Sequence, residues 1–214
     1  MDSDSENDSI DQLEEFRKAN IKPGMFVSGW EDPNDEIYED EDPHSTLERK
    51  ILWATNEGKI DIVRTILNAK PSCVHAKDDD GYTPLHRACY NNNVELAQLL
   101  IQYGADVNAL TNFKWTPLHS SCQWSNSKCV AMLLQYGANV NSRTDGDQTP
   151  LHIAASVSNC REMAMTLMLN PGVEPHLTNN SKETAADIAR RTGLTFPVFE
   201  MAHSAFVDNV NRID

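Results

Sequence analysis

The tetrapeptide Thr-Pro-Leu-His occurs three times in the chain, at Thr83–His86, Thr116–His119 and Thr149–His152. Consecutive copies begin 33 residues apart in both intervals. A motif that recurs at a fixed spacing of this size indicates structural repeats, each of which buries its apolar face against its neighbours. The spacing therefore predicts an array of similar stacked units rather than a fold around one central core.

Each copy of the motif has the residues of a helix start. A threonine side chain accepts hydrogen bonds from free backbone N–H groups, so Thr83, Thr116 and Thr149 are predicted N-caps. Proline suits the first helical position, because its φ is fixed and the N–H that it lacks would have no partner there. The leucine and the small residue three positions later, such as Leu85 and Ala88, share one helix face and are predicted to pack against the next unit.

An apolar segment follows each motif and predicts a second helix in every unit, over Val94–Ile101, Cys129–Leu134 and Met163–Leu169. The first two segments end at Tyr-Gly-Ala, where Gly104 and Gly137 can take the left-handed conformation that ends a helix. The predicted fold is therefore all-α, with helix–turn–helix units joined by β-turns.

Two less regular copies flank the three clear ones. Upstream, Ile51–Ala54 and Gly58–Val63 align with the first clear copy; downstream, Glu183–Ala189 has a similar helix start without the Pro-Leu-His core. End units depart from a consensus because one of their sides faces water. The predicted organisation is an acidic, largely disordered arm at 1–42, a repeat domain at 43–207 with about five repeats (46–79, 80–112, 113–145, 146–180 and 181–207) that closes with a helix at 196–206, and a tail at 208–214.

Motif, period and helix ends together resemble ankyrin repeats. This resemblance implies that His86, His119 and His152 tie the first helix of each unit to turn backbone. It also implies a concave face, lined by the turn tips and the ends of the first helices, that binds a protein partner. A narrower resemblance, to one ankyrin-repeat protein with an acidic leader, includes Trp30 and Trp53. That resemblance implies a non-enzymatic protein of the nucleus or cytosol that is linked to gene expression.

Aromatic residues gather at the positions that the resemblance assigns to partner binding. The predicted protein-binding residues belong to the second and third repeats and are Tyr82, Tyr90, Phe113, Trp115 and Trp124. Exposed aromatic side chains on a rigid surface are typical binding anchors, each contributing about 2 kcal/mol or more. Two alternatives stay open. The tryptophans pack against each other or under a neighbouring turn, or the acidic arm covers this surface within the same chain.

Charge is concentrated in the first 42 residues, which carry fifteen acidic and three basic side chains, a net charge of −12 out of −14 for the whole chain. Such a composition favours disorder. Neutralising phosphates requires Lys and Arg, so no direct binding of nucleic acid is expected. Apolar residues alternate with the carboxylates, as in transcriptional activation segments that dock into a partner. The simpler interpretation of the arm is a solubilising tail.

The sequence does not favour an enzyme or a metalloprotein. No Cys or His pair has the close spacing of a zinc site, and no Gly-rich phosphate-binding loop is present. We therefore predict no catalytic residue, metal or cofactor. Cys89 and Cys122 are 33 residues apart, at repeat positions where a thiol packs as a small apolar residue. No early apolar run matches a signal peptide or a membrane span, so we expect a monomer of the nucleus or cytosol without membrane contact.

The resemblance also implies one candidate modification. Leu100, Asp106 and Val107 precede Asn108 in the pattern of ankyrin repeats that an asparaginyl hydroxylase modifies. Asn141 matches this pattern less well, since it lacks the preceding acidic residue. The alternative is that these asparagines only form hydrogen bonds within their turns.

Overall fold

The computed structural model describes residues 46–157 and 161–193 together with Phe199. Contacts divide the chain into Met1–Asp40 and Glu41–Asp214, and all described residues belong to the second of these units. The predicted acidic arm, the tail and all of the predicted closing helix except Phe199 lie outside the described residues.

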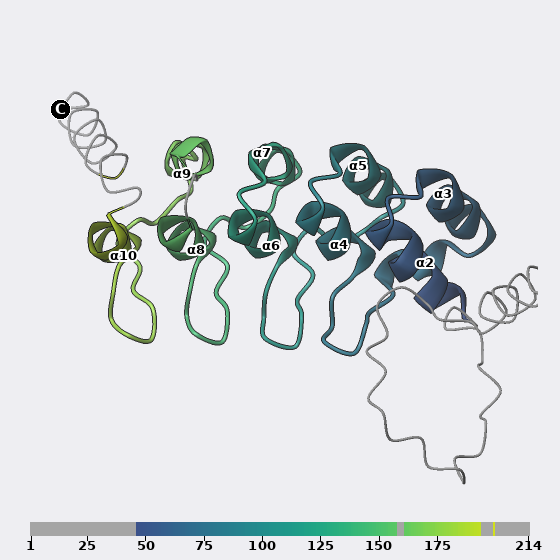
Figure 1. Cartoon of the computed structure of the whole chain (residues 1–214), viewed down its shortest axis with the longest axis horizontal. Helices are drawn as coiled ribbons and strands as arrows, with labels where there is room; N and C mark the ends of the chain where they lie inside the picture. The colour runs from purple at the N-terminus through teal and green to yellow at the C-terminus, as the bar shows by residue number, and fades with distance from the viewer. Residues whose placement is uncertain (1–45, 158–160, 194–198, 200–214) are drawn as a thin grey trace, which may run out of the picture. The chain divides into compact units, whose positions relative to one another are not determined.

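The described residues fold into nine α-helices in two rows, as the all-α prediction requires (Figure 1). The first row holds α2 (Leu47–Asn56), α4 (Pro84–Tyr90), α6 (Pro117–Gln123), α8 (Pro150–Ser156) and α10 (Ala185–Thr192). The second row holds α3 (Ile60–Ala69), α5 (Val94–Gln102), α7 (Ser127–Gln135) and α9 (Arg161–Met168), and a short 3-10 helix, η1, spans Pro71–His75. Hairpin-shaped turns extend from the first row on the side away from the second row (Figure 1). None of the helices in this part of the chain is long and apolar enough to span a membrane.

The predicted helix starts are confirmed, with proline as the first residue of α4, α6 and α8. The backbone N–H of each N-cap threonine donates to Nδ1 of the motif histidine, for example from Thr116 to His119 at 3.1 Å. Histidine therefore has the part that glutamate or glutamine has in an ordinary capping box. The last unit uses Thr184 and Asp187 in the same way, with 3.0 Å between the Thr184 nitrogen and the carboxylate.

The second helices are longer than their apolar segments indicate. α7 begins at Ser127 instead of Cys129, and α9 begins at Arg161 instead of Met163. The additional residues are polar and stand in the first turn of each helix, so hydrophobic periodicity alone does not detect them. Gly104 and the equivalent glycine after α7 have positive φ angles of 89° and 82°, which confirms the predicted helix ends.

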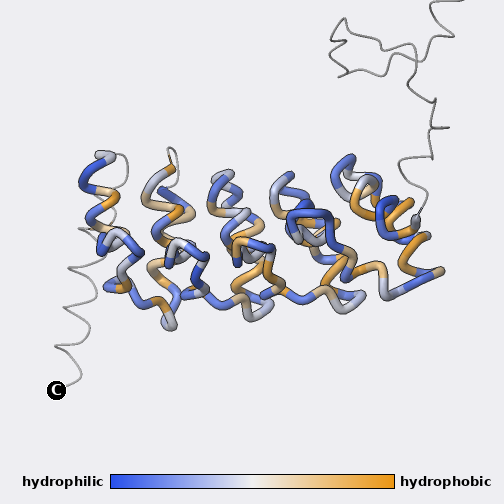
Figure 2. The backbone as a smooth tube through the Cα atoms, turned by 90° about the horizontal axis from the view of Figure 1, so that it is seen from below, coloured by the Kyte–Doolittle hydropathy of each residue, from blue (hydrophilic) through white to orange (hydrophobic). Residues whose placement is uncertain are grey.

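The core runs along the array, between successive units. One leucine from each motif helix is buried in it: Leu85 and Leu118 are 0% exposed and Leu151 is 2% exposed. Figure 2 shows hydrophobic segments along the helices of every unit and hydrophilic segments in many of the turns that connect them. Phe199 is 4% exposed and belongs to the same core. Each unit therefore depends on its neighbours for the burial of its apolar face.

Candidate protein-binding surface

The five predicted binding residues occupy two parts of the array. Tyr90 ends α4 and Trp124 is the C-cap of α6, so both lie at the ends of first-row helices. Tyr82, Phe113 and Trp115 lie in the hairpin turns that lead into α4 and α6. The structure brings these residues together only in part, and the two groups differ in exposure.

Tyr90 and Trp124 form an aromatic pair between two adjacent repeats. Their ring centroids are 4.7 Å apart and their planes are inclined by 62°, an edge-to-face arrangement. Such pairs contribute about 0.5–1.5 kcal/mol beyond the area that they bury. Even so, Tyr90 is 40% exposed and Trp124 is 54% exposed. Two large rings are therefore held in place while much of their surface faces solvent.

A buried amide holds this pair in position. The side-chain Nδ2 of Asn126 donates to the carbonyl oxygens of Cys89 and Tyr90, at 2.8 Å in both cases. These bonds join the loop after Trp124 to the end of α4. The Thr-Pro-Leu-His motif does not indicate this role. The period does provide a signal, since Asn93, 33 residues earlier, occupies the equivalent place.

Phe113 lies at the tip of the hairpin before α6 and is 60% exposed. The tip is held from both sides. The backbone N–H of Asn112 donates to the carbonyl of Asp80 at 2.9 Å, and the backbone N–H of Asp145 donates to the carbonyl of Phe113 at 3.2 Å. The ring is therefore presented to solvent by backbone that is tied to two neighbouring hairpins.

Tyr82 is partly buried, and its ring contacts side chains of α4, the helix that its own hairpin precedes. Its ring lies edge-on to His86, with 5.5 Å between ring centroids. The guanidinium carbon of Arg87 stands 4.9 Å from the centroid of the tyrosine ring, and Arg87 also forms an ion pair with Asp78. A cation, an aromatic face and a carboxylate thus meet at this position.

Trp115 is also partly buried. It packs against the hydrophobic core, and its ring centroid lies 6.0 Å from that of His119. The ring of Trp124 pairs with Tyr90. Within the described residues, Trp115 and Trp124 do not stack against each other. The accessible part of the predicted surface consequently consists of Tyr90, Phe113 and Trp124, which we call the aromatic surface.

The three motif histidines connect successive repeats. The Nε2 atoms of His86, His119 and His152 each lie 3.1 Å from the backbone carbonyl oxygen of the residue that precedes the next N-cap threonine. Burial lowers the pKa of His86 and His119 to about 4. These imidazoles are therefore neutral at physiological pH. Their hydrogen bonds give them a structural role, which is to link successive repeats.

The candidate hydroxylation residue Asn108 also bridges two repeats. Its Oδ1 accepts the backbone N–H of Asn139 at 2.8 Å, while its own backbone N–H donates to Asp106 at 2.9 Å. Asn141 forms an equivalent bridge, since its Nδ2 donates to the carbonyl of Gly172 at 2.8 Å. The side chains thus bind the next repeat and are not confined to their own turns. Hydroxylation of Asn108 stays a prediction.

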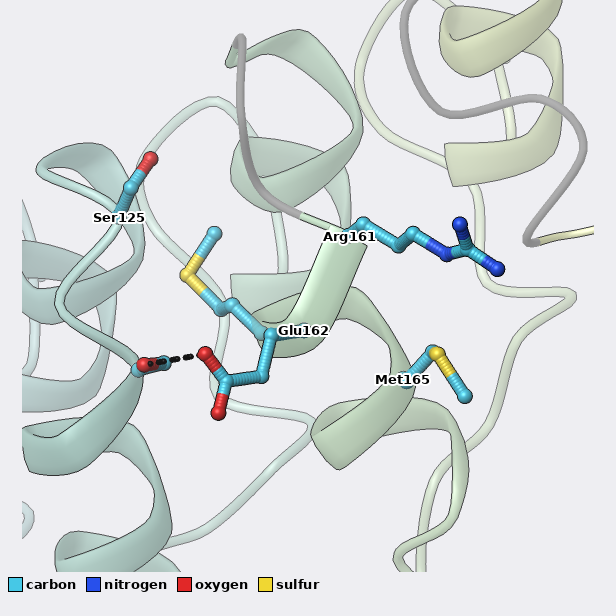
Figure 3. A pocket seen from close by; sticks show the side chains of 6 residues that line it. Ser125, Arg161, Glu162 and Met165 are labelled. Carbon is cyan, nitrogen blue, oxygen red and sulfur yellow. Dashed lines mark hydrogen bonds between the residues drawn. The ribbon is translucent and has the colours of Figure 1, made fainter.

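An open cleft of about 450 Å³ lies between the starts of α7 and α9 (Figure 3). Ser127 Oγ donates to Glu162 Oε2 at 3.0 Å, and Arg161 extends away from that bond (Figure 3). One of the residues that line the cleft, Ser125, directly follows Trp124 in the sequence. The full lining is Ser125, Ser127, Arg161, Glu162, Met163 and Met165. One positive and one negative side chain balance each other there, so the cleft favours neither charge in a ligand. No group of three or more potential metal ligands occurs within the described ranges.

The cysteines in the described ranges are buried, as the packing interpretation predicts. Cys89 and Cys122 are both 0% exposed and lie on α4 and α6. Burial raises the pKa of the Cys89 thiol well above its usual value. A protonated thiol in the core behaves as a small apolar side chain.

Motif, helix pairs and inter-repeat bonds define a class of repeat protein. The chain belongs to the ankyrin repeat family, since the family model for ankyrin repeats in three copies matches residues 51–144 and 108–179. Proteins of this family present surfaces that mediate protein–protein interactions, typically without enzymatic activity.

Relatives of similar length carry one name. The chain is 55% identical to Ankyrin repeat domain-containing protein 49 of Drosophila melanogaster, with 100% of this chain and 98% of the relative covered. It is 50% identical over 173 residues to the human protein of that name, with 80% of this chain and 72% of the relative covered. The mouse protein is 46% identical over 178 residues, with coverage of 80% and 73%. The narrower resemblance noted in the sequence is thereby confirmed.

Proposed function

We propose that this protein is a non-enzymatic adaptor that binds a protein partner through the aromatic surface, on the concave face of the ankyrin repeats. The supporting observation is the exposure of Tyr90, Phe113 and Trp124, at 40%, 60% and 54%, on two adjacent repeats. Aromatic residues are enriched among the side chains that dominate binding energy at protein interfaces. Large exposed rings that are fixed in place lower the solubility of a protein unless a partner covers them.

The aromatic surface is ordered before any partner arrives. Asn126 fixes the loop after Trp124, and backbone bonds hold Phe113 between two hairpins. Binding then requires little ordering of side chains or loops, which leaves more of the contact energy for affinity. This property suits a surface that captures a segment of another protein without changing its own backbone.

We place the adaptor in the regulation of gene expression, in the nucleus or the cytosol, and we expect it to act as a monomer. The support is the composition of residues 1–42, where apolar residues alternate with fifteen carboxylates, as in activation segments. The acidic arm is not expected to bind nucleic acid, because such binding requires an excess of basic residues. A role in the regulation of gene expression therefore requires the repeat array to bind a protein partner.

An affinity capture from cell extract tests the adaptor function. Full-length wild type is compared with Trp124→Ala and Phe113→Ala variants, whose folding is checked by thermal unfolding. Both side chains are largely exposed, so the variants are expected to fold. We expect at least one protein to be retained by wild type and lost from both variants, and its purified form to bind wild type at least about tenfold more tightly.

Tyr136→Ala is the matched control, since Tyr136 is a 44% exposed aromatic residue at the end of the second-row helix α7. It should retain the same proteins as wild type. A set of captured proteins that is identical for wild type, Trp124→Ala and Phe113→Ala would refute the aromatic surface as the binding site.

A transcription coactivator is the second candidate function, favoured by the composition of the arm. In that case residues 1–42 recruit the transcription machinery, and the repeats select the regulator. The two functions are separated by tethering residues 1–42 alone to DNA upstream of a reporter gene. Reporter activation that is lost when the apolar residues of the arm are replaced by serine supports a coactivator. An inactive arm supports an adaptor.

A further inference from the structure

The charges around Phe113 indicate what kind of partner the aromatic surface accepts. We propose that this part of the surface binds a partner segment that contains arginine or lysine, with the basic side chain placed against the Phe113 ring and beside the carboxylates of Asp79 and Asp80. The inference rests on the proposed function and adds the chemistry of the partner.

The two hairpin tips that form this part of the surface lie directly against each other. Asn112 Nδ2 donates to the carbonyl of Asp79, and its backbone N–H donates to the carbonyl of Asp80, both at 2.9 Å. A Cβ placed on Gly81 would lie 2.8 Å from Asn112 Oδ1. Phe113 directly follows Asn112, so its exposed ring and the two exposed aspartates lie on two hairpin tips that are bonded to each other, which we call the patch.

The carboxylates of this patch have no positive partner within the part of the chain that the structure describes. Asp79 and Asp80 are exposed, and neither forms an ion pair with any described residue. Lys114, next to the phenylalanine, is held by Asp145 at 2.9 Å on the following hairpin. Lys77 donates instead to the carbonyl of Leu110 at 3.0 Å. Lys77 and Lys114 are therefore engaged elsewhere, and two exposed carboxylates remain on the hairpin tip that is bonded to the tip of Phe113.

The preceding hairpin and α4 together already contain the complete form of this arrangement, with a cation, an aromatic ring and a carboxylate. Arg87 stands 4.9 Å from the centre of the Tyr82 ring and pairs with Asp78. At Phe113 an aromatic ring and two carboxylates are present, and no cation from the described ranges forms an ion pair with these carboxylates. A cation is attracted to the face of an aromatic ring and to a carboxylate at once, so a basic side chain complements this patch.

The charge pattern also argues against the acidic arm as the occupant of this patch. Residues 1–42 carry a net charge of −12, and they would bring carboxylates next to Asp79 and Asp80. Carboxylates that face each other across an interface repel, so binding of an acidic segment at this position is disfavoured. Asp79 and Asp80 attract a basic segment of another protein, whereas they repel the acidic arm of the same chain.

A phage-displayed library of random linear peptides, selected on the full-length protein, provides the probe. We expect the selected peptides to be enriched in arginine or lysine and to bind more weakly as salt concentration rises. One selected peptide is then synthesised and its affinity is measured for wild type and variants. Asp79→Asn with Asp80→Asn should weaken binding about three- to tenfold. Phe113→Ala should weaken it about tenfold or more.

Two controls carry matched changes away from the patch. Asp61→Asn with Glu95→Gln removes two exposed carboxylates from the second-row helices α3 and α5, and Tyr136→Ala removes an exposed aromatic ring from the end of α7. Both should leave the affinity for the peptide unchanged. A loss of affinity in these controls equal to that at the patch would overturn the inference, because binding would then follow overall charge or aromatic content.

The selection separates this inference from the proposed function. Peptides without basic residues that still lose affinity in Phe113→Ala or Trp124→Ala would overturn the basic partner and leave the adaptor in place. Basic peptides whose affinity no aromatic variant changes would contradict both. Failure to select any peptide would also count against the inference, since a short basic segment is its stated ligand.

Discussion

The Nε2 atom of His86 lies 3.1 Å from the carbonyl oxygen of Trp115, which stands 29 residues later in the chain. On the other side of the same ring, Nδ1 accepts the backbone N–H of Thr83 at 3.2 Å. Because Nδ1 accepts a hydrogen bond there, the proton of the neutral ring is on Nε2, which donates to Trp115. One imidazole therefore caps its own helix and fixes the next hairpin. The bond from Thr83 requires the neutral form of the ring, because a protonated imidazole has no acceptor nitrogen.

We expect His119→Ala to lower the free energy of unfolding by ~3 kcal/mol. The substitution leaves the buried N–H of Thr116 and the carbonyl of Gln148 without partners and opens a cavity in the core. Urea denaturation of the full chain measures the change. His75→Ala, at an exposed position, is the control and should change stability by less than about 0.5 kcal/mol. Equal losses in the two variants would refute the structural role of His119.

Stability should fall on mild acidification. The pKa of His86 and His119 is lowered from 6.5 to about 4 by burial, so protons bind the unfolded chain more strongly. Their contribution to stability is fully present above pH 6.5 and is lost as the pH falls from 6.5 towards 4. At about 1.4 kcal/mol per pKa unit, this loss amounts to ~3 kcal/mol for each histidine.

Denaturation curves recorded from pH 7 to pH 4 test this pH dependence. His119→Gln removes one of the titrating groups, so its stability at pH 7 should be lower and its decline with acid should be less steep than in wild type. A wild-type free energy of unfolding that stays constant between pH 6.5 and pH 5 would contradict the assignment of neutral, buried imidazoles.

Two glycines with similar backbone angles should respond differently to alanine. Gly81 has a φ of +84° and Gly104 has a φ of +89°. A Cβ at Gly81 would collide with Asn112, whereas nothing lies within 4 Å of one at Gly104. We expect Gly104→Ala to lower the free energy of unfolding by about 1 kcal/mol, from the left-handed backbone alone. Gly81→Ala should cost ~3 kcal/mol or more, and thermal unfolding of both variants measures the difference.

Asn108 should be hydroxylated in protein isolated from the cells that produce it. Mass spectra of the tryptic peptide 88–114 would then show a form that carries one additional oxygen atom on Asn108. Asn141 is the internal comparison and should be modified less, because Asn139 replaces the acidic residue that precedes Asn108. Spectra that contain only unmodified Asn108 would end this prediction.

The sequence predicted the helices of the array well because their ends depend on local chemistry. Thr116 caps α6, Pro117 begins it, and Gly137 ends the helix that follows. Each of these residues acts within a few positions of itself, and a period of 33 residues repeats the same solution. The apolar pattern predicts later starts for α7 and α9 than the structure has, because the first turns of these helices carry polar residues that such a pattern does not detect.

The candidate site was only partly predictable. The aromatic positions followed from the repeat register, yet Trp115 and Trp124 have different surroundings, one half-buried against the core and the other paired with Tyr90 in solvent. The repeat register predicts the position in its unit from which a side chain extends. Its exposure depends on the neighbours that adjacent repeats supply, and those neighbours differ from one repeat to the next.

The class of fold, the helix pairs and the positions of the motif histidines follow from the sequence, because short-range capping and a fixed period specify backbone geometry. The exposure of the aromatic rings and the pairing of the charged side chains depend instead on how the repeats pack in three dimensions. Lys114 pairs with Asp145, and no residue that the structure describes forms an ion pair with Asp79. The choice between such ion-pair partners depends on distances between side chains of different repeats, which the order of residues along the chain does not specify.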